Sequence, residues 1–378
     1  MADKTFIAER VLIEGQWVPE QAVTVSGGKI TCVGPTSGSD SGAIHLDGTV
    51  VPGFFDIQVN GGGGVLFNDN PSVEAIKVIG AAHRQYGTTS FLPTLISDDR
   101  EKIVAAIHAV SQAIEAGVPG VVGIHLEGPF LNDAKKGIHD ASKFRRMKPG
   151  DVDMLSSLSH GKTLVTLAPE RVNADQIRAL VAAGVVVSAG HTAATYEQAL
   201  AGVNAGVTGF THLYNAMTGL ESRAPGVVGA AFDSPNAWAG LIADGYHVHP
   251  AALRHAINTK GVDRSILVTD AMPIVGSDSD EFWLDGQLIT ACDGVCCNAE
   301  GVLAGSALDM ASAVKYTASE LGFGLAAAAQ MASRNPAEFV GLCEHIGSIA
   351  VGQKADFVVL NADLGVDSVW IAGENHTT

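Results

Sequence analysis

The sequence predicts an α/β fold, a (β/α)₈ TIM barrel with a small β-sandwich domain formed from both ends of the chain. Three observations favour it. Eight short apolar, β-branched runs recur through the middle of the chain, alanine-rich segments of helical spacing lie between most of them, and both ends are β-rich instead. Continuous apolar strands that alternate with helices are typical of a parallel sheet covered on both faces. Eight such units are the number that closes a barrel.

The two ends of the chain share one character, because both carry short strand-like runs separated by turns that contain glycine. These runs are residues 6–13, 21–25, 29–33, 347–360 and 368–372. We therefore expect residues 1–50 and 345–378 to form one small domain. Residues 51–344 are then left for the barrel.

The barrel strands are expected at the apolar runs, in chain order. They are residues 50–59, 89–95, 121–126, 163–167, 185–189, 209–213, 239–243 and 265–269. Helical spacing is clearest in residues 72–86, 100–116, 174–183, 195–205 and 250–259. Four glycines at 61–64 follow the first strand, but they lack the spacing of a dinucleotide fingerprint and no Gly-Lys-Ser/Thr follows them. A nucleotide-binding sheet is therefore disfavoured.

Composition and charge exclude several classes of protein. The formal net charge is −17 and no basic cluster is present, so nucleic acid and anionic membranes are poor partners. The longest uncharged stretch, residues 198–220, includes Asn204, His212 and Asn215, which makes a membrane span unfavourable. The N-terminus has early acidic residues and no apolar core of a signal peptide. With an odd count of five cysteines, we expect a reduced, cytoplasmic protein.

Three of the cysteines, Cys292, Cys296 and Cys297, lie close together in a segment where we expect a β-hairpin insertion at about residues 280–300. A soft-metal site would need a partnering Cys-x-x-Cys pair or a nearby histidine, and neither follows in the sequence. We interpret the three as thiols within the hairpin, and their role stays open.

Polar side chains follow the predicted strands, where a barrel places its catalytic groups. Imidazoles and carboxylates terminate five of the eight runs. The residues at the ends of the runs are Gln58, Asn60, His125, Glu127, His191, His212, Asp244, His247 and Asp270. Because unpaired groups of this kind are costly to bury, their repeated placement indicates a functional site.

Glu127, His191 and His212 supply one carboxylate and two imidazoles, a ligand set typical of a catalytic divalent metal that keeps an open position for water. Asp270 stands outside this set and could accept a proton from the attacking water and deliver it to a leaving nitrogen. Each residue also has a plainer interpretation. A single one of the three could be a hydrogen-bonded core residue, and Asp270 could cap a helix or pair with a cation.

Several motifs together resemble the N-acetylglucosamine-6-phosphate deacetylases of the amidohydrolase superfamily. They are VPGFFDIQVNGGGG (51–64), HLEGPF (125–130), AGHT (189–192), THLYNAM (211–217), DGYH (244–247), TDAM (269–272) and LAGS (303–306). The resemblance covers essentially the whole chain. It implies hydrolysis of the N-acetyl amide of a hexosamine phosphate to glucosamine 6-phosphate and acetate, as in amino-sugar catabolism or recycling.

The resemblance also implies roles for individual residues. The metal would be held by Glu127, His191 and His212, and Asp270 would be the acid/base that acts on a metal-activated water. His247 would contact the substrate and help to polarise its carbonyl. The positions matched to those that line the sugar and phosphate are Gly137, Ile138, His139, Asn215, Ala216, Leu303, Ala304 and Gly305. Arg223 matches the phosphate-binding arginine, which in homodimers reaches the neighbouring active site.

One departure from many amidohydrolases bears on the metal count. The His-x-His pair of the first strand is replaced by Gln58 and Asn60, and neutral amides are poor ligands for a zinc-like ion. The fourth strand also lacks a central lysine that could bridge two metals, since Lys162 lies at its start. We therefore expect one divalent ion per subunit, Zn²⁺ first, although Fe²⁺, Mn²⁺ and Co²⁺ accept the same ligands.

Two other functions stay open at this point. A dihydroorotase-like cyclic-amide amidohydrolase would share the barrel, but the missing histidine pair and lysine disfavour it. A catalytically inactive barrel that serves as a scaffold would be expected to have lost ligands that are present here. Strictness for the 6-phosphate, the sugar epimer and any assembly beyond a homodimer are not determined by the sequence. Lys135, Lys136 and Arg223 also have a plainer interpretation as solvated surface cations.

Overall fold

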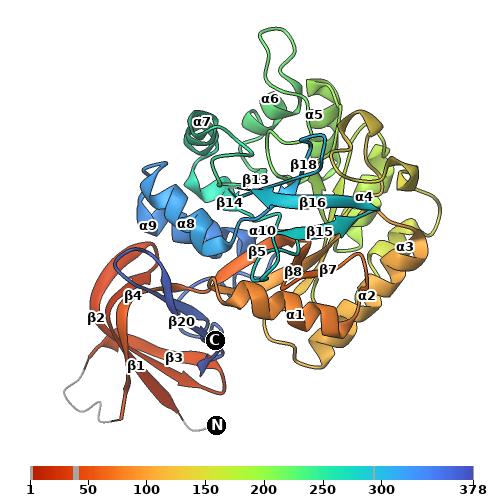
Figure 1. The fold of residues 1–378 in the computed structure, drawn as a ribbon. Helices are drawn as coiled ribbons and strands as arrows, with labels where there is room; N and C mark the ends of the chain where they lie inside the picture. Colours follow the sequence, from red (N-terminus) through yellow and green to blue (C-terminus); the bar gives the residue numbers. More distant parts are fainter. Residues whose placement is uncertain (1–2, 37–41, 293, 378) are drawn as a thin grey trace.

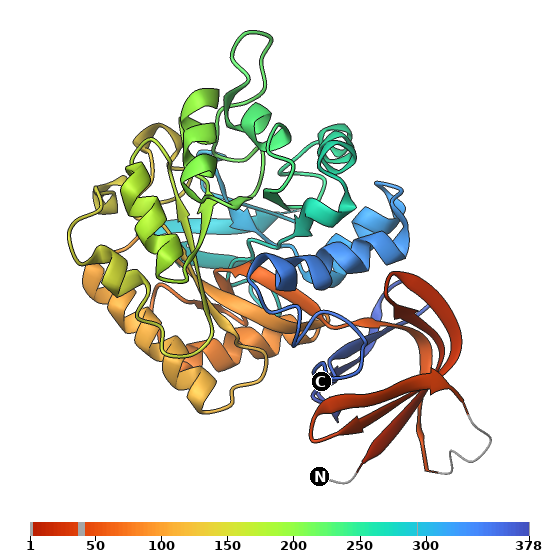
Figure 2. The ribbon, with the colours of Figure 1, turned by 180° about the vertical axis from the view of Figure 1, so that it is seen from behind.

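The chain folds into a barrel with a smaller β domain beside it (Figure 1). The computed structural model describes residues 3–36, 42–292 and 294–377. The first and last segments of the chain lie together in the small domain, and the middle of the chain forms the barrel (Figure 2). In the described part of the chain, no helix is both long enough and apolar enough to cross a bilayer.

The barrel contains all eight predicted parallel strands, hydrogen-bonded in the order β14-β13-β12-β11-β10-β9-β8-β5. Their bounds are β5 Phe54–Val59, β8 Thr88–Ile96, β9 Gly123–Glu127, β10 Lys162–Leu167, β11 Val186–Ala189, β12 Gly209–Phe210, β13 Trp238–Leu241 and β14 Ser265–Leu267. The first predicted run is divided between two elements, because residues 50–52 belong to the small domain.

Backbone bonds between the first strand and the segment after the last one close the barrel. The Asp270 amide donates to the carbonyl of Gln58 over 3.0 Å, and the Asn60 amide donates to the carbonyl of Ala271 over 3.0 Å. Val59 and Ala271 pair in parallel at the same seam. Residues more than 200 positions apart in sequence are thereby brought together at the carboxyl ends of the strands.

Helices cover the outside of the barrel (Figure 2). They are α1 Val73–Arg84, α2 Arg100–Glu115, α3 Asp151–Leu155, α4 Ala174–Ala182, α5 Tyr196–Ala205, α6 Gly226–Phe232, α7 Pro250–Lys260, α8 Met310–Ser319, α9 Gly324–Ala332 and α10 Arg334–Phe339. Local sequence sets several starts: Asn173 and Thr195 each form a capping box. His249 caps α7 by accepting from the Ala251 amide, as expected for a polar residue before Pro250.

The small domain is one seven-stranded sheet in the order β21-β20-β19-β4-β1-β2-β3. Its strands are β1 Lys4–Ile13, β2 Gln16–Ser26, β3 Lys29–Pro35, β4 Ile44–Pro52, β19 Phe357–Leu360, β20 Val366–Ile371 and β21 Glu374–Asn375. The sheet curls over an apolar core of its own, which includes Phe6, Phe357 and Trp370. The Ile30 amide bonds to the carbonyl of Gln353, so the edge at β3 meets the segment that precedes β19.

A four-stranded antiparallel sheet lies over the barrel end, formed by β15 Glu281–Leu284, β16 Gln287–Cys292, β17 Val295–Cys297 and β18 Leu303–Ser306 (Figure 1). Beneath it the glycine run forms a short ladder of β6 Gly61–Gly62 and β7 Val65–Leu66. The buried Cys296 packs in an apolar cluster with Met272 and Phe282, and Cys297 is half-buried. The side chain of Cys292 lies outside the described residues. Burial raises the pKa of the Cys296 thiol to about 12, which makes it unreactive.

Candidate active site

A pocket of about 390 Å³ lies between the carboxyl ends of the barrel strands and the covering sheet. A volume of this size accommodates a small ligand. The residues that line it are Asn60, Ile96, Glu127, Ala134, Lys135, Gly137, Ile138, His139, His191, His212, Asn215, Ala216, Ile242, His247, Asp270, Met272, Val302, Leu303 and Gly305. Most of the residues singled out in the sequence are therefore in one place.

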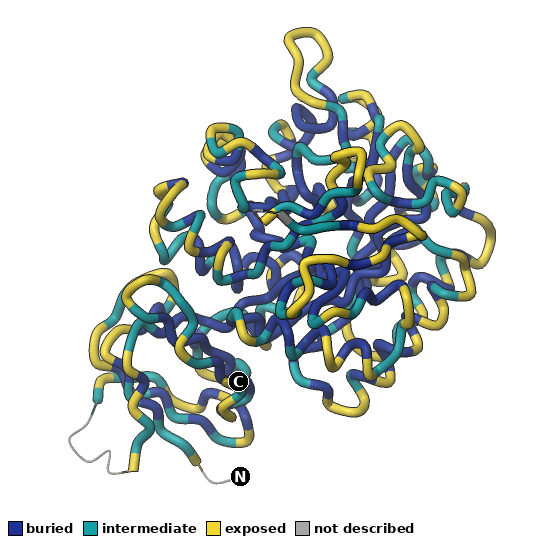
Figure 3. The backbone as a smooth tube through the Cα atoms, viewed as in Figure 1, coloured by how far each residue is buried: buried dark blue, intermediate teal, exposed yellow. Residues whose placement is uncertain are grey.

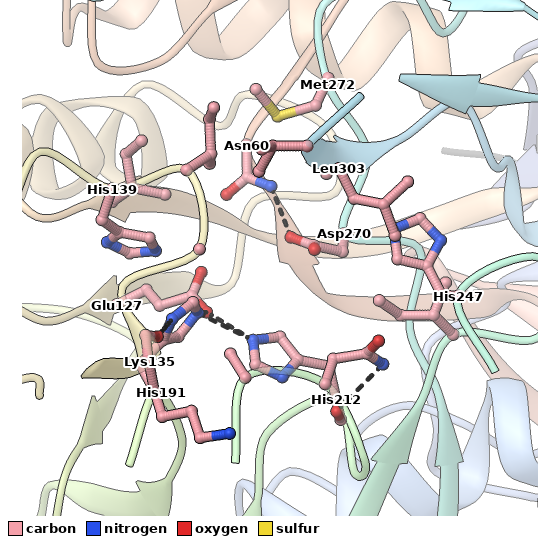
Figure 4. Close-up of a pocket in the computed structure, with 18 of the residues that line it drawn as sticks. Asn60, Glu127, Lys135, His139, His191, His212, His247, Asp270, Met272 and Leu303 are labelled. Atoms are coloured by element: carbon pink, nitrogen blue, oxygen red, sulfur yellow. Dashed lines mark hydrogen bonds and ion pairs between the residues drawn. The ribbon is translucent and has the colours of Figure 1, made fainter. Parts of the chain in front are cut away.

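Glu127, His191 and His212 meet at the floor of the pocket (Figure 4). The Nε2 atom of His212 lies 3.0 Å from Glu127 Oε1 and 3.1 Å from His191 Nε2, and His191 Nε2 lies 3.2 Å from the same carboxylate oxygen. All three side chains are buried. Burial alone would raise the pKa of Glu127, but hydrogen bonds and charges from the two histidines outweigh it and hold that pKa well below its usual range.

The donor set fits a divalent cation. His191 Nδ1 lies 2.8 Å from the carbonyl oxygen of Lys135, so this nitrogen carries the proton and Nε2 presents a lone pair to the pocket. Two imidazole nitrogens and a carboxylate oxygen then converge on one point, where a positive ion can replace the hydrogen bonds among them. Nitrogen and oxygen ligands of this kind suit zinc and its neighbours in the first transition row.

His139 lies beside this cluster. One of its ring nitrogens and ligand atoms of Glu127 and His191 all lie within 4.8 Å of one another. Its Nδ1 atom lies 3.3 Å from the backbone amide nitrogen of Ser97 and 2.9 Å from the Ser97 hydroxyl. Burial, and next the charge of His191, lower the pKa of His139 to about 3, so the ring is neutral. His139 could therefore donate to a bound molecule or join Glu127 and His191 around a cation.

Gln58 and Asn60 connect the two carboxylates of the site. The Gln58 side-chain amide donates to both oxygens of Glu127 over 3.2 Å and to Asp270 Oδ1 over 3.1 Å. Asn60 donates to the same Asp270 oxygen over 2.7 Å (Figure 4). N–H groups thus occupy the space between the carboxylates, where a second cation would have to bind. The replacement of second-metal ligands by these amides stays a prediction.

Asp270 is held in a strained backbone conformation, with φ at +53°. The residue before it, Thr269, is held by two hydrogen bonds: its hydroxyl donates to Asp56, and the Ser306 hydroxyl donates to its carbonyl. Burial, and next the charge of Glu127, raise the pKa of Asp270. A carboxyl whose pKa is raised toward neutrality is better suited to accept and return a proton.

His247 lies on the far side of Asp270 from Glu127 in the view of Figure 4. Its Nδ1 atom is 2.5 Å from Asp244 Oδ2, and the other oxygen of Asp244 accepts the backbone amides of Tyr246 and His247. Burial would lower the pKa of His247, but the hydrogen bond and charge of Asp244 raise it. The ring is therefore oriented with Nε2 toward the pocket and is readily protonated.

Three of the predicted site residues do not line the pocket. Gln58 lies beneath its floor, and Ala304 is fully buried in the apolar cluster under the covering sheet. Arg223 lies in an exposed loop, residues 219–224, which projects from the barrel above α6 (Figure 3). It lines a separate hollow of about 460 Å³. Within one chain, the structure does not bring Arg223 to the ligand cluster.

Sequence reasoning gave no role to several residues that shape the site. Lys135 lines the pocket, although its sequence context was equally typical of a solvated surface cation. Asp244 orients His247, a role that its place in the DGYH motif could have suggested. Gly137, predicted only as a sugar-lining position, also packs against His191: its φ is +57°, and a Cβ atom there would lie 3.3 Å from the ring.

The chain matches the model of the amidohydrolase family over residues 49–375. The chain is similar to the N-acetylgalactosamine-6-phosphate deacetylase of Shewanella sp. (strain ANA-3), with 46% identity over 97% of this chain and 94% of that protein. It is also similar to the N-acetylglucosamine-6-phosphate deacetylase of Vibrio furnissii, with 36% identity over 97% of this chain and 94% of the relative.

Among solved structures, the N-acetylglucosamine-6-phosphate deacetylase of Pasteurella multocida superposes with a TM-score of 0.95 at 32% identity, covering 99% of both chains. An aspartate-to-alanine mutant of the Mycobacterium smegmatis enzyme, in complex with N-acetyl-D-glucosamine-6-phosphate, superposes with a TM-score of 0.93 at 32% identity over 100% of both chains. The similarity therefore includes the small domain as well as the barrel.

Proposed function

The chain belongs to the amidohydrolase family, and from that premise we propose that it is a deacetylase of N-acetylglucosamine 6-phosphate, releasing glucosamine 6-phosphate and acetate. The observation that carries the proposal is the convergence of Glu127, His191 and His212 beside Asp270 in one pocket. The similarity to deacetylases over nearly the full chain supports the substrate class. The pathway we propose is cytoplasmic amino-sugar catabolism or recycling.

Glu127, His191 and His212 would hold one divalent ion, for which we propose Zn²⁺. When bound, such an ion polarises the acetamide carbonyl and acidifies the attacking water. The Gln58 amide supports a single ion, because its two N–H groups point at Glu127 and Asp270. Metal analysis of the purified protein should give one ion per chain. Two tightly held ions, both needed for activity, would contradict this proposal.

The protein's own residues supply the proton transfers. Asp270 accepts a proton from the attacking water and returns it to the sugar nitrogen as the C–N bond breaks. His247, whose pKa Asp244 raises, donates to the carbonyl oxygen as negative charge develops there. His139 supplies a neutral Nε2–H donor to the bound substrate. Backbone groups of Gly137, Asn215 and Leu303 line the remaining surface of the sugar site.

The phosphate site is proposed to lie between two subunits of a homodimer. Arg223 sits in the exposed loop 219–224 and does not line the pocket of its own chain, which suits a residue that reaches the pocket of a partner. Arg223→Gln should raise KM for the phosphorylated sugar far more than it lowers kcat. Equal kcat/KM for the sugar with and without its phosphate in the wild type would contradict this role.

Mixed subunits test the shared site directly. A heterodimer of Arg223→Gln and Asp270→Asn chains contains one pocket with both Asp270 and an arginine contributed by the other chain. Mixing the two weak variants should therefore restore part of the wild-type activity. No restoration, with heterodimers shown to form, would mean that Arg223 serves its own pocket or none.

A second candidate substrate is the C4 epimer, N-acetylgalactosamine 6-phosphate. The relative with 46% identity over 97% of this chain carries that activity in its name. An acetate-release assay with both phosphorylated sugars, with their unphosphorylated forms and with dihydroorotate decides among the candidates. The preferred substrate is the one with the highest kcat/KM. No turnover of any of them by metal-loaded protein would favour the inactive scaffold.

A further inference from the structure

Glu170 lies in the loop after β10, outside the pocket and outside every role assigned above. Its carboxylate accepts three hydrogen bonds. Oε1 accepts from the Asn132 side chain over 2.9 Å and from the Ala193 amide over 2.8 Å, and Oε2 accepts from the Thr192 hydroxyl over 2.5 Å. Asn132 belongs to the loop after β9, and Thr192 and Ala193 belong to the loop after β11. One carboxylate thus joins three successive loops at the carboxyl ends of the strands.

The loop after β9 also holds His191, which lies in the loop after β11. The backbone amide of Asn132 donates to the carbonyl of His191 over 2.9 Å, and His191 Nδ1 donates to the carbonyl of Lys135 over 2.8 Å. Asn132 also starts the short helix Asp133–Lys135, by accepting from the Ala134 amide. The carbonyl that sets the protonation of the His191 ring is therefore placed by a segment whose first residue is bonded to Glu170.

His191 requires such support, because its φ of +47° is unfavourable for a residue with a side chain. Without the Glu170 carboxylate, the Thr192 hydroxyl, the Ala193 amide and the Asn132 side chain would each lose a partner. The loop that carries Lys135 could then move relative to His191, and the Nδ1–carbonyl bond that directs Nε2 at the pocket would loosen. Groups that orient a ligating histidine in this way commonly control metal affinity.

We propose that Glu170 is a positioning residue for the metal site, acting through His191 and the Lys135 carbonyl. This inference rests on the proposed metal site. Its direct consequence is that Glu170 sets metal affinity without contacting the ion or the substrate. A merely structural role would instead lower the stability of the metal-free protein and leave its affinity for metal unchanged.

The test compares Glu170→Gln with the wild type by chelator competition for Zn²⁺ and by the absorption spectrum of the Co²⁺ form. The glutamine keeps the shape of the side chain but replaces one carboxylate oxygen by an NH₂ group. That group cannot accept the hydrogen bonds that Asn132, Thr192 and Ala193 donate. We expect a Kd for Zn²⁺ about 10- to 100-fold weaker and an altered Co²⁺ spectrum. Asp309→Ala is the control, since Asp309 accepts two bonds from Ser312 at the start of α8, remote from the ligand loops, and should leave both readouts unchanged.

Thr192 offers a second, milder pair of variants in case Glu170→Gln does not fold. Thr192→Ser keeps the hydroxyl that bonds to Glu170 and should retain the wild-type affinity, whereas Thr192→Val removes it and should weaken binding. Equal Zn²⁺ affinities for Glu170→Gln and wild type, or for the two Thr192 variants, would overturn the inference alone. A wild type that binds no Zn²⁺ would overturn the proposed function and this inference with it.

Discussion

The carboxyl end of the barrel and the small β domain use left-handed backbone conformations for different purposes. In the small domain the non-glycine residues with positive φ are Glu14, Glu20, Leu364 and Ala372. At the carboxyl end of the barrel they are His191, His212, Tyr214, Ala216 and Asp270, all within or next to the pocket, and one more, Asp285, lies at the turn between β15 and β16. Strain in the small domain lies away from the pocket, whereas in the barrel it includes the residues proposed to bind metal and move protons.

The cores of the two regions also differ in polarity. The core of the small domain is apolar, with Phe6 in edge-to-face contact with both Phe357 and Trp370. The barrel end instead buries Glu127, His125 and Asp56 among hydrogen-bond partners. This difference teaches that the small domain contributes stability and the barrel end contributes chemistry, so mutations in the two regions should have separable effects.

The largest effect should come from a carboxyl at the barrel end. Asp270→Asn cannot carry the proton, so kcat should fall about 10²- to 10⁴-fold while metal content and folding are kept. Asp356→Asn is the matched control in the small domain, where the buried Asp356 pairs with Lys354 and accepts from the Ala372 amide. It should lower the melting temperature and leave kcat unchanged. Unchanged turnover in Asp270→Asn would refute the acid/base role.

The second largest effect should come from the core of the small domain, where a substitution should lower the free energy of unfolding and leave kcat unchanged. Phe357→Ala removes a ring that is 1% exposed and packs 5.1 Å from Phe6, so we expect a loss of about 3–5 kcal/mol in the free energy of unfolding. Urea unfolding measures the loss, and steady-state kinetics on the folded fraction measure kcat. A large fall in kcat per folded molecule would show that the small domain also shapes the active site.

Asp56 lies at the seam of the barrel and is one of the titratable groups buried there, so the pH dependence of stability tests the contrast with the apolar core of the small domain. Burial raises its pKa to about 7 from 3.8, despite hydrogen bonds from Thr269 and Gln58. The unfolded chain therefore loses this proton first, and the contribution of Asp56 to stability should fall as pH rises from about 4 to about 7 and stay constant above. Asp56→Asn should remove this pH dependence of the free energy of unfolding. The change over the whole range should be about a few kcal/mol, as expected for a pKa shift of this size.

Unfolding of metal-free protein at several pH values measures the Asp56 effect. Asp151→Asn provides a control of opposite sign. Burial would raise the pKa of Asp151, but its hydrogen bond from Arg145 and nearby charges lower it, so its stabilisation is lost as pH falls. Parallel pH profiles for wild type and Asp56→Asn would show that Asp56 does not titrate in this range.

The smallest effect should come from the residue that orients His247. Asp244→Asn keeps the size of the side chain but removes the charge that raises the pKa of the His247 imidazole, so kcat should fall about 10- to 100-fold with little change in KM. His249→Ala is the control, because His249 only caps α7 in the same loop and should cost about 1 kcal/mol of stability. Equal kcat values for the two variants would contradict the role of Asp244.

Much of this arrangement could be predicted from local sequence. Apolar runs and helical spacing are read over a few residues, so the eight strands were predicted close to their positions, except that residues 50–52 joined the small domain. The motifs that end the strands predicted that Glu127, His191, His212 and Asp270 would meet, because the carboxyl ends of parallel strands lie at one end of a barrel.

The sequence by itself therefore determined the fold class and the residue types of the site. Only the tertiary structure decided how those residues are arranged: that the Gln58 amide joins Glu127 to Asp270, that Ser97 holds the ring of His139, and that Glu170 joins the loops around His191. The physical reason is range. Strand and helix patterns are set by neighbouring residues, whereas these hydrogen bonds join segments that approach each other only when the barrel closes.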